Sequence, residues 1–107
     1  MPKERIAAKR LRAIARRSPV AVILGARQVG KSTLARLAFP DYTFFDLEDP
    51  RDAARVSADP LFALSQQRRV VVDEAQRVPT LRPVLRSYVD ADARRRVVLL
   101  GSASPGS

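Results

Sequence analysis

Residues 25–32 read Gly-Ala-Arg-Gln-Val-Gly-Lys-Ser, which matches the Walker A pattern of phosphate-binding loops. An unbroken apolar run, Val20–Leu24, precedes this stretch and is typical of a strand buried on both faces. A helical pattern from Lys31 to about Ala38 follows it. Because a strand, a glycine-bounded loop and a helix in this order are the context that the motif requires, the sequence predicts a P-loop.

Each position of this loop has a chemical reason. The glycines allow the main chain to approach a phosphate closely, and successive backbone N–H groups then bind its oxygens. The helix that begins near Lys31 adds the positive end of its dipole at the same place. We expect the Lys31 ammonium group to bridge the β- and γ-phosphates of a nucleotide, and the Ser32 hydroxyl group to ligate Mg²⁺.

A second motif ends the expected strand Arg69–Asp73, whose apolar run is Val70–Val72, with two carboxylates, Asp73 and Glu74. Open α/β sheets bind their ligands at the carboxyl ends of their strands, so this is a Walker B pattern. Asp73 is expected to hold Mg²⁺, and Glu74 to orient or deprotonate the attacking water.

Polar residues at two further strand ends are weaker candidates. Ser102 follows the apolar run Val97–Leu100 and could sense the γ-phosphate or position the water. A serine in a turn after a strand is also common for purely structural reasons. Asp46 and Glu48 end another strand, where a turn or a salt bridge explains them as well as a place near the nucleotide does.

The rest of the chain alternates strands with helices. Further strands are expected at Tyr42–Leu47, Arg69–Asp73 and Arg96–Leu100. Further helices are expected at residues 3–17, 51–57 and 60–67, and from a Thr80 N-cap to about Asp90. This alternation predicts an α/β protein with a mainly parallel sheet.

Length and composition restrict the function further. A chain of 107 residues with 46% hydrophobic residues suits one small globular domain. No apolar run approaches the ~20 residues of a membrane span, and no signal peptide is visible, so we expect a cytoplasmic protein without membrane contact. The sequence contains neither cysteine nor histidine, which excludes disulfides, thiolate metal sites and Ser-His or Cys-His catalysis.

The net charge of +9 is concentrated at the beginning of the chain. Residues 1–36 contain ten lysines and arginines but a single acid, Glu4. Such a basic segment suits a polyanion, either a nucleotide or a nucleic acid, but charge runs are more often a solvated helix face. We therefore divide the chain into a basic N-terminal helix at residues 1–18 and a nucleotide-binding core at residues 19–107.

Four stretches together resemble a family of prokaryotic AAA+ ATPases, in the same order. They are residues 25–32, Phe45–Glu48, Val72–Pro79 and Leu100–Ser104. The resemblance implies that Asp73 and Glu74 are the Walker B residues and that Ser102 is a sensor. It also implies that ATP is bound by Gly25, Ala26, Arg27, Gln28, Val29, Gly30, Lys31, Ser32 and Thr33.

The resemblance also implies segments that this sequence does not show. In that family a fifth strand, a helical lid and typically a large C-terminal domain of unknown function follow the sensor strand. We therefore expect a P-loop NTPase sandwich truncated after its fourth strand, with the strand order 1-4-3-2. Val20–Leu24 would then be an apolar edge strand, from which we expect low stability or self-association.

The leading hypothesis is ATP binding with Mg²⁺-dependent hydrolysis, as the N-terminal fragment of an AAA+ ATPase. Whether the fragment turns over ATP is left open, because a lid and an arginine from a neighbouring subunit are missing. The alternatives are a DEAD-like nucleic-acid motor, a small-molecule kinase, and a basic DNA-binding module without turnover. ATP and Mg²⁺ are the expected ligands, and a nucleic acid is a further candidate partner.

Overall fold

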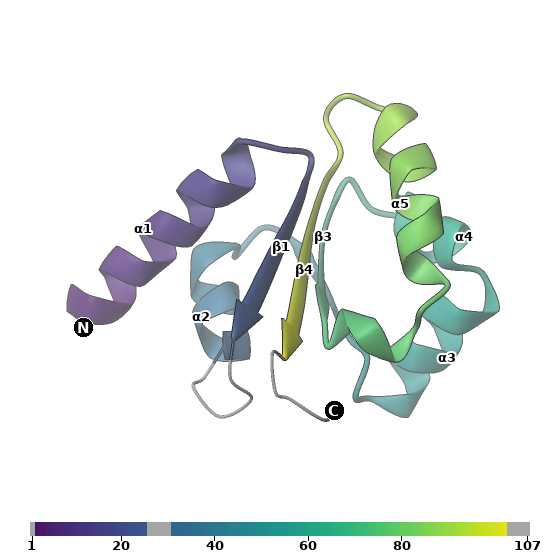
Figure 1. The fold of residues 1–107 in the computed structure, drawn as a ribbon, viewed down its shortest axis with the longest axis horizontal. Coiled ribbons are helices and arrows are strands. Elements are labelled where there is room, and N and C mark those ends of the chain that lie inside the picture. Colours follow the sequence, from purple (N-terminus) through teal and green to yellow (C-terminus); the bar gives the residue numbers. More distant parts are fainter. Residues whose placement is uncertain (1, 26–30, 103–107) are drawn as a thin grey trace.

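A four-stranded parallel sheet forms the centre of the computed structural model, which describes residues 2–25 and 31–102 (Figure 1). Its strands lie in the order β1-β4-β3-β2. Their bounds are β1 Val20–Gly25, β2 Thr43–Asp46, β3 Arg69–Asp73 and β4 Arg96–Ser102. The predicted α/β class and the predicted strand order are therefore confirmed.

Helices cover both faces of the sheet (Figure 1). One face packs against α1 and α2, whereas α3, α4 and α5 lie over the other. The helix bounds are α1 Pro2–Arg16, α2 Lys31–Ala38, α3 Pro50–Ala58, α4 Pro60–Ser65 and α5 Leu81–Asp90, with a short 3₁₀ helix, η1, at Ala75–Arg77. Among the described residues, none of the helices is long and apolar enough to cross a membrane.

The two central strands carry most of the core. Val70, Val71 and Val72 of β3 are completely buried, because this strand has neighbours on both sides and helices on both faces. A continuous apolar run is the pattern that such a strand requires. The run ends abruptly at Asp73, which places a carboxylate at the carboxyl edge of a rigid strand.

Two aspartates begin the helices of the α3–α4 pair. The Asp49 carboxylate accepts a hydrogen bond from the Arg51 backbone N–H at 2.9 Å, and Asp59 accepts one from Phe62 at 3.1 Å. In both helices a proline occupies the first turn, where a missing N–H costs nothing. Thr80 occupies the N-cap position of α5, as predicted, but in contrast to the two aspartates its side chain makes no capping hydrogen bond.

The edge strand β1 is less buried than its sequence predicts. Val22 is 46% exposed and Leu24 is 62% exposed, so the expectation of a strand buried on both faces is wrong for these residues. Both lie on the same face of the sheet as Leu99, toward α5. The helices on that face pack over the central strands and leave the end of β1 uncovered. The expected low stability or self-association stays a prediction.

Tyr88 of α5 provides a test of the core. Its ring is completely buried, and its hydroxyl group donates a hydrogen bond to the Gln67 carbonyl at 2.6 Å. Burial raises the pKa of Tyr88 above its ordinary value of 10.0, against the opposing charge of Arg95. The pKa of Tyr88 is higher in the folded than in the unfolded protein. The stability that the neutral, buried Tyr88 contributes is therefore present below pH 10 and is lost as the pH rises through the folded-state pKa.

Tyr88→Phe is expected to lower the free energy of unfolding by about 1 kcal/mol at neutral pH, because the Gln67 carbonyl loses its donor. The variant should also lose less stability than the wild type between pH 10 and 11. Urea unfolding followed by circular dichroism at pH 7 and pH 10.5 measures both effects. An unchanged midpoint at pH 7 would contradict the prediction.

Candidate nucleotide-binding site

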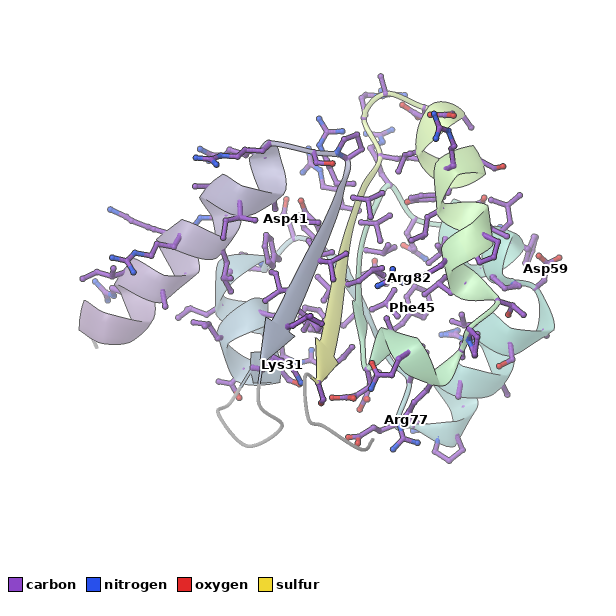
Figure 2. The ribbon with its side chains drawn as sticks, in the orientation of Figure 1. Lys31, Asp41, Phe45, Asp59, Arg77 and Arg82 are labelled. Atoms are coloured by element: carbon purple, nitrogen blue, oxygen red, sulfur yellow. The ribbon has the colours of Figure 1, made fainter. Side chains whose placement is uncertain are left out.

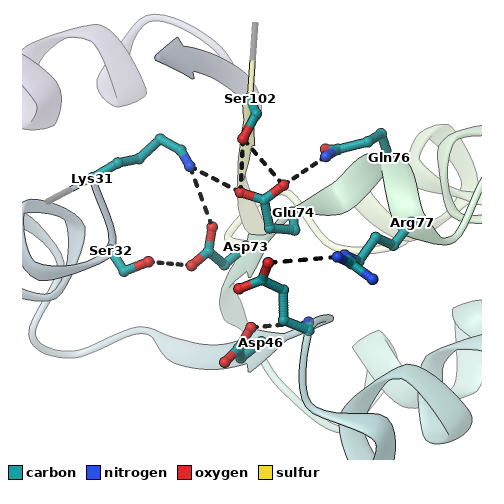
Figure 3. Close-up of polar contacts among 9 residues, drawn as sticks. Lys31, Ser32, Asp46, Asp73, Glu74, Gln76, Arg77 and Ser102 are labelled. Carbon is teal, nitrogen blue, oxygen red and sulfur yellow. Dashed lines mark hydrogen bonds and ion pairs between the residues drawn. The ribbon is translucent and has the colours of Figure 1, made fainter. Parts of the chain in front are cut away.

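The predicted site residues meet at the carboxyl edge of the sheet, beside the first residues of α2 (Figure 3). Because β1, β3 and β4 are parallel, their carboxyl ends lie at one edge, where Gly25 pairs in register with Ser102 and Asp73 with Leu100. Lys31 and Ser32, the last two residues of the predicted Walker A motif, begin α2. Residues far apart in the sequence are therefore brought into direct contact.

Lys31 lies between the two carboxylates of the predicted Walker B motif. Its Nζ atom is 3.0 Å from Glu74 Oε2 and 4.0 Å from Asp73 Oδ1. The residue is only 9% exposed, and a buried ammonium group needs such partners to remain charged. The Lys31 ammonium group therefore lies near the N-terminus of α2, where the positive end of the helix dipole adds to its charge.

Ser32 and Asp73 together offer oxygen ligands of the kind that Mg²⁺ prefers. The Ser32 hydroxyl group donates a hydrogen bond to Asp73 Oδ2. The second oxygen, Asp73 Oδ1, is buried and has no hydrogen-bond partner among the described residues. A hydroxyl and a carboxylate side by side, one of them with an unused oxygen, fit a magnesium ion that takes its remaining ligands from phosphate and water.

The described residues contain no cluster of three or more acids that would form an all-protein metal cage. Binding through one or two protein oxygens plus a nucleotide is the usual mode for Mg²⁺.

Glu74 has an unusual backbone. Its φ of 56° and ψ of 49° lie in the left-handed region, which a non-glycine residue adopts at a cost of about 1–3 kcal/mol. This conformation turns the chain sharply after β3 into η1. The Glu74 carboxylate is thereby directed back into the cluster, where it is 5% exposed. Strain of this kind is commonly retained at functional sites.

Three side chains hold the Glu74 carboxylate. It accepts hydrogen bonds from Lys31 at 3.0 Å, from Gln76 at 2.6 Å and from Ser102 at 2.9 and 3.2 Å. Burial alone raises the pKa of Glu74, but these hydrogen bonds and the charge of Lys31 outweigh it and lower the pKa below its ordinary value. The carboxyl group is therefore ionised at neutral pH.

Ser102 is the last residue of β4, so it does not belong to a turn after that strand. This position corrects the predicted end of the strand at Leu100. The Ser102 hydroxyl group donates to the Glu74 carboxylate, whose two oxygens lie 2.9 and 3.2 Å from Ser102 Oγ. Because Ser102 lies on a strand that pairs with β1, its position relative to Glu74 is held by the sheet.

Gln76 is a site residue that our sequence reasoning assigned no role. Its amide group donates to Glu74 Oε1, and its Oε1 atom would lie 3.2 Å from a Cβ atom placed on Gly101 (Figure 3). The spacing of two residues after the second acid of the motif was the available signal. This spacing indicates a contact between Gln76 and Glu74 only once the left-handed turn at Glu74 is known.

Asp46 and Glu48 lie at the border of the site and make local contacts. The Asp46 carboxylate accepts a hydrogen bond from the Glu48 backbone N–H at 3.0 Å, which closes the turn after β2. Glu48 lies 3.5 Å from Arg77, as an ion pair between two half-exposed side chains. Asp46 therefore takes part in a turn and Glu48 in a salt bridge, which are the structural roles considered for them above.

The loop residues Ala26, Arg27, Gln28, Val29 and Gly30 lie outside the described residues, and so do the predictions made for them. Gly25 ends β1 at one side of that segment. At the other side Thr33 lies on α2 and is exposed.

A comparison with protein families matches the model described as "AAA domain" to residues 17–107. The chain belongs to this family. Membership indicates a nucleotide-binding domain of the P-loop ATPase type, in agreement with the fold and with the expected resemblance. The matched region includes residues 25–32, the two acids Asp73 and Glu74, and Ser102, and it excludes α1.

Two curated relatives of this AAA domain are uncharacterized proteins, one from Mycobacterium bovis and one from Mycobacterium tuberculosis. Each is 49% identical to the chain over 108 residues, a region that covers 96% of the chain and 24% of the relative. The chain therefore spans about a quarter of the length of these relatives. No solved structure matches it significantly.

Proposed function

We propose that this AAA domain binds ATP together with Mg²⁺ and hydrolyses the γ-phosphate, as part of an AAA+ ATPase. The observation that carries the proposal is the convergence of Lys31, Asp73, Glu74 and Ser102 on one buried point at the start of α2. The relatives are about four times as long as the matched region, so in them this domain is one part of a larger protein.

Each side chain has a distinct role in this proposal. Lys31 binds the β- and γ-phosphates, whose negative charge replaces that of the carboxylates around its ammonium group. Glu74 accepts a hydrogen bond from the attacking water and directs it toward phosphorus. Ser102 and Gln76 position the Glu74 carboxylate, and Ser102 is close enough to respond to the γ-phosphate through it.

Ser32 and Asp73 would hold the magnesium ion. When bound, Mg²⁺ neutralises charge on the phosphates and supports their orientation. The chain itself supplies the hydroxyl oxygen of Ser32 and the Oδ1 atom of Asp73, which accepts no hydrogen bond from the described residues. Ser102 and Glu74 form a second contact between a hydroxyl group and a carboxylate next to Lys31. In that contact the Ser102 hydroxyl group already positions the Glu74 carboxylate, so we assign the magnesium ion to Ser32 and Asp73.

Asp73→Asn tests this assignment through metal dependence. Isothermal titration calorimetry with ATP is expected to give about tenfold weaker binding for the variant in the presence of Mg²⁺, because a neutral amide oxygen is a poorer magnesium ligand. With EDTA in place of Mg²⁺, wild type and variant should bind ATP within a factor of about two of each other.

The matched control is Asp90→Asn, which removes one exposed carboxylate that pairs with Arg86 on α5. This control should bind like the wild type under both conditions. Equal affinities of the wild type with Mg²⁺ and with EDTA would contradict the metal assignment, and no measurable ATP binding in either would contradict the proposed function.

A further inference from the structure

A cavity lies at the opposite edge of the sheet from the candidate nucleotide-binding site. It has a volume of about 300 Å³ and is formed by the ends of α1 and α2 and the first residues of β3 and β4. In Figure 1 this edge is at the top, where the strands begin. A strand of seven residues such as β4 spans about 20 Å, so the cavity is separate from the cluster around Lys31.

Arginine dominates this cavity. Four of its lining residues are arginines: Arg12, Arg16, Arg69 and Arg96. Asp41 is the only carboxylate among the described residues that line it, and Arg69 binds that carboxylate at 2.8 Å. Among the described residues, no acid forms an ion pair with the other three arginines. The cavity therefore carries a net charge of about +3 from these groups at neutral pH.

The negative ends of two helices offset only part of this positive charge. Both α1 and α2 end at the cavity, and each helix C-terminus carries about half a negative charge. Arg12 uses this contact, because its Nη1 atom donates to the Ala38 carbonyl at 3.4 Å. Two half-charges offset one arginine, which leaves an excess of about two positive charges. A fold needs no such excess, since like charges in a cavity repel one another.

The positive charge continues along α1 as a stripe. Arg5, Lys9, Arg12 and Arg16 recur at intervals of four, three and four residues, which places them on one side of the helix. The stripe lies next to the side that is buried through Ala8 and Ala15, and it runs about 16 Å along the helix into the cavity. Figure 2 shows long side chains projecting from α1 on the side away from the sheet and at its end near Asp41.

We propose that the cavity and this basic stripe bind consecutive phosphate groups of a nucleic-acid strand. A single phosphate would need the cavity alone, whereas a line of about 16 Å equals roughly five base-pair steps of duplex axis at about 3.4 Å each, which is long enough to contact several phosphates. Guanidinium groups bind phosphate oxygens in bidentate fashion, and arginine outnumbers lysine in the cavity and stripe by five to one. The proposal concerns a site apart from that of ATP and does not depend on hydrolysis.

The test is binding of a fluorescein-labelled DNA strand of about 15 nucleotides, and of the same sequence as a duplex, measured by fluorescence anisotropy at about 50–200 mM NaCl. The double variant Arg12→Gln and Arg16→Gln is expected to bind at least one of these about tenfold more weakly than the wild type, or weaker still. The dependence of log affinity on log salt concentration should become shallower by about 1–2 units.

The matched control is Arg82→Gln with Arg86→Gln, which removes two exposed arginines from α5 and changes the net charge equally. Its affinity is expected to stay within about twofold of the wild type. An equal loss in both double variants would overturn the proposal, because binding would then depend on net charge alone. Undiminished binding by the cavity variant would overturn it as well.

Arg16→Gln alone keeps the test valid if the double variant does not fold. Arg16 is exposed and has no hydrogen-bond or ion-pair partner among the described residues, so its loss should leave thermal unfolding unchanged while weakening DNA binding severalfold. A loss of DNA binding in a Lys31→Ala variant that remains folded would instead place the phosphates at the P-loop and overturn the proposal.

Two competitors identify the source of the phosphate. Inorganic phosphate should displace the labelled strand only at high millimolar concentration, and polyglutamate should compete much less well than unlabelled DNA. If inorganic phosphate binds in an Arg16-dependent manner while neither DNA binds, the ligand is a small phosphate compound and the nucleic-acid proposal is wrong. Equal competition by polyglutamate would show that the surface recognises any polyanion, which is also against it.

Discussion

Glu74→Gln is expected to lower the rate of ATP hydrolysis by about 10²–10⁴-fold while ATP binding is retained. Three different side chains, those of Lys31, Gln76 and Ser102, donate hydrogen bonds to the Glu74 carboxylate and hold it at the carboxyl end of β3. An amide of the same shape keeps the contact with Lys31 but loses the negative charge that orients the water. The effect should therefore fall on turnover and spare affinity.

The fold should tolerate this change. The amide oxygen introduced by Glu74→Gln can still accept from Lys31, and only one acceptor position is lost to Ser102 or Gln76, which are both in partial contact with solvent. Rapid mixing of excess protein with radiolabelled ATP and Mg²⁺ measures a single turnover, which is sensitive to slow hydrolysis. Calorimetry with ATP supplies the affinity, expected to lie within about threefold of the wild-type value.

The control is Glu48→Gln, which neutralises a carboxylate that lies near the same edge but pairs with Arg77. Its single-turnover rate should remain within about twofold of the wild type. Equal rates for Glu74→Gln and wild type would remove Glu74 from the mechanism. Equal losses in both variants would mean that general electrostatics, and no particular carboxylate, supports the reaction.

Much of the site was predictable because two motifs end rigid elements. A P-loop must follow one strand and precede one helix, which places Lys31 and Ser32, and a carboxylate after an apolar strand lies at the carboxyl edge, which places Asp73. The order of the strands came from the family resemblance, since the pattern of residues alone does not distinguish between neighbours. The contact of Lys31 with Glu74 follows only once that order is known.

Other features depend on tertiary contacts that leave no local trace. The left-handed backbone at Glu74 turns Gln76 toward the carboxylate, and the spacing of the two residues does not by itself predict this turn. The exposure of Val22 depends on how far the helical layer extends over β1. Similarly, Arg12 and Arg96 are separated by most of the chain and line the same cavity because α1 ends where β4 begins.

Lys31→Ala should weaken the binding of ATP with Mg²⁺ by about 10–100-fold. Hydrogen bonds to charged groups contribute about 1.5–3 kcal/mol each, and about 1.4 kcal/mol corresponds to a factor of ten in affinity. Lys31 is the only cation among the described residues within 4.0 Å of both Asp73 and Glu74, so no neighbour can replace it. Calorimetric titration of wild type and variant with ATP measures the loss.

The interpretation requires that the variant remains folded, because Lys31 also neutralises two buried carboxylates. Removal of the ammonium group leaves Asp73 and Glu74 facing each other without a cation, which destabilises the native state. Lys31→Arg separates the two roles: it keeps the positive charge and should melt close to the wild type. Its planar guanidinium group does not reproduce the compact ammonium contact, so ATP affinity should still fall.

Arg86→Ala removes one exposed charge far from the site and should leave ATP affinity unchanged, which controls for net charge. If Lys31→Arg and Lys31→Ala both melt like the wild type and bind ATP equally well, the P-loop lysine makes no contact with the phosphates. If only the alanine variant loses affinity and its fold is lost as well, Lys31 acts by holding the carboxylates together. A folded arginine variant with weakened binding is the one combination that a direct contact with phosphate explains.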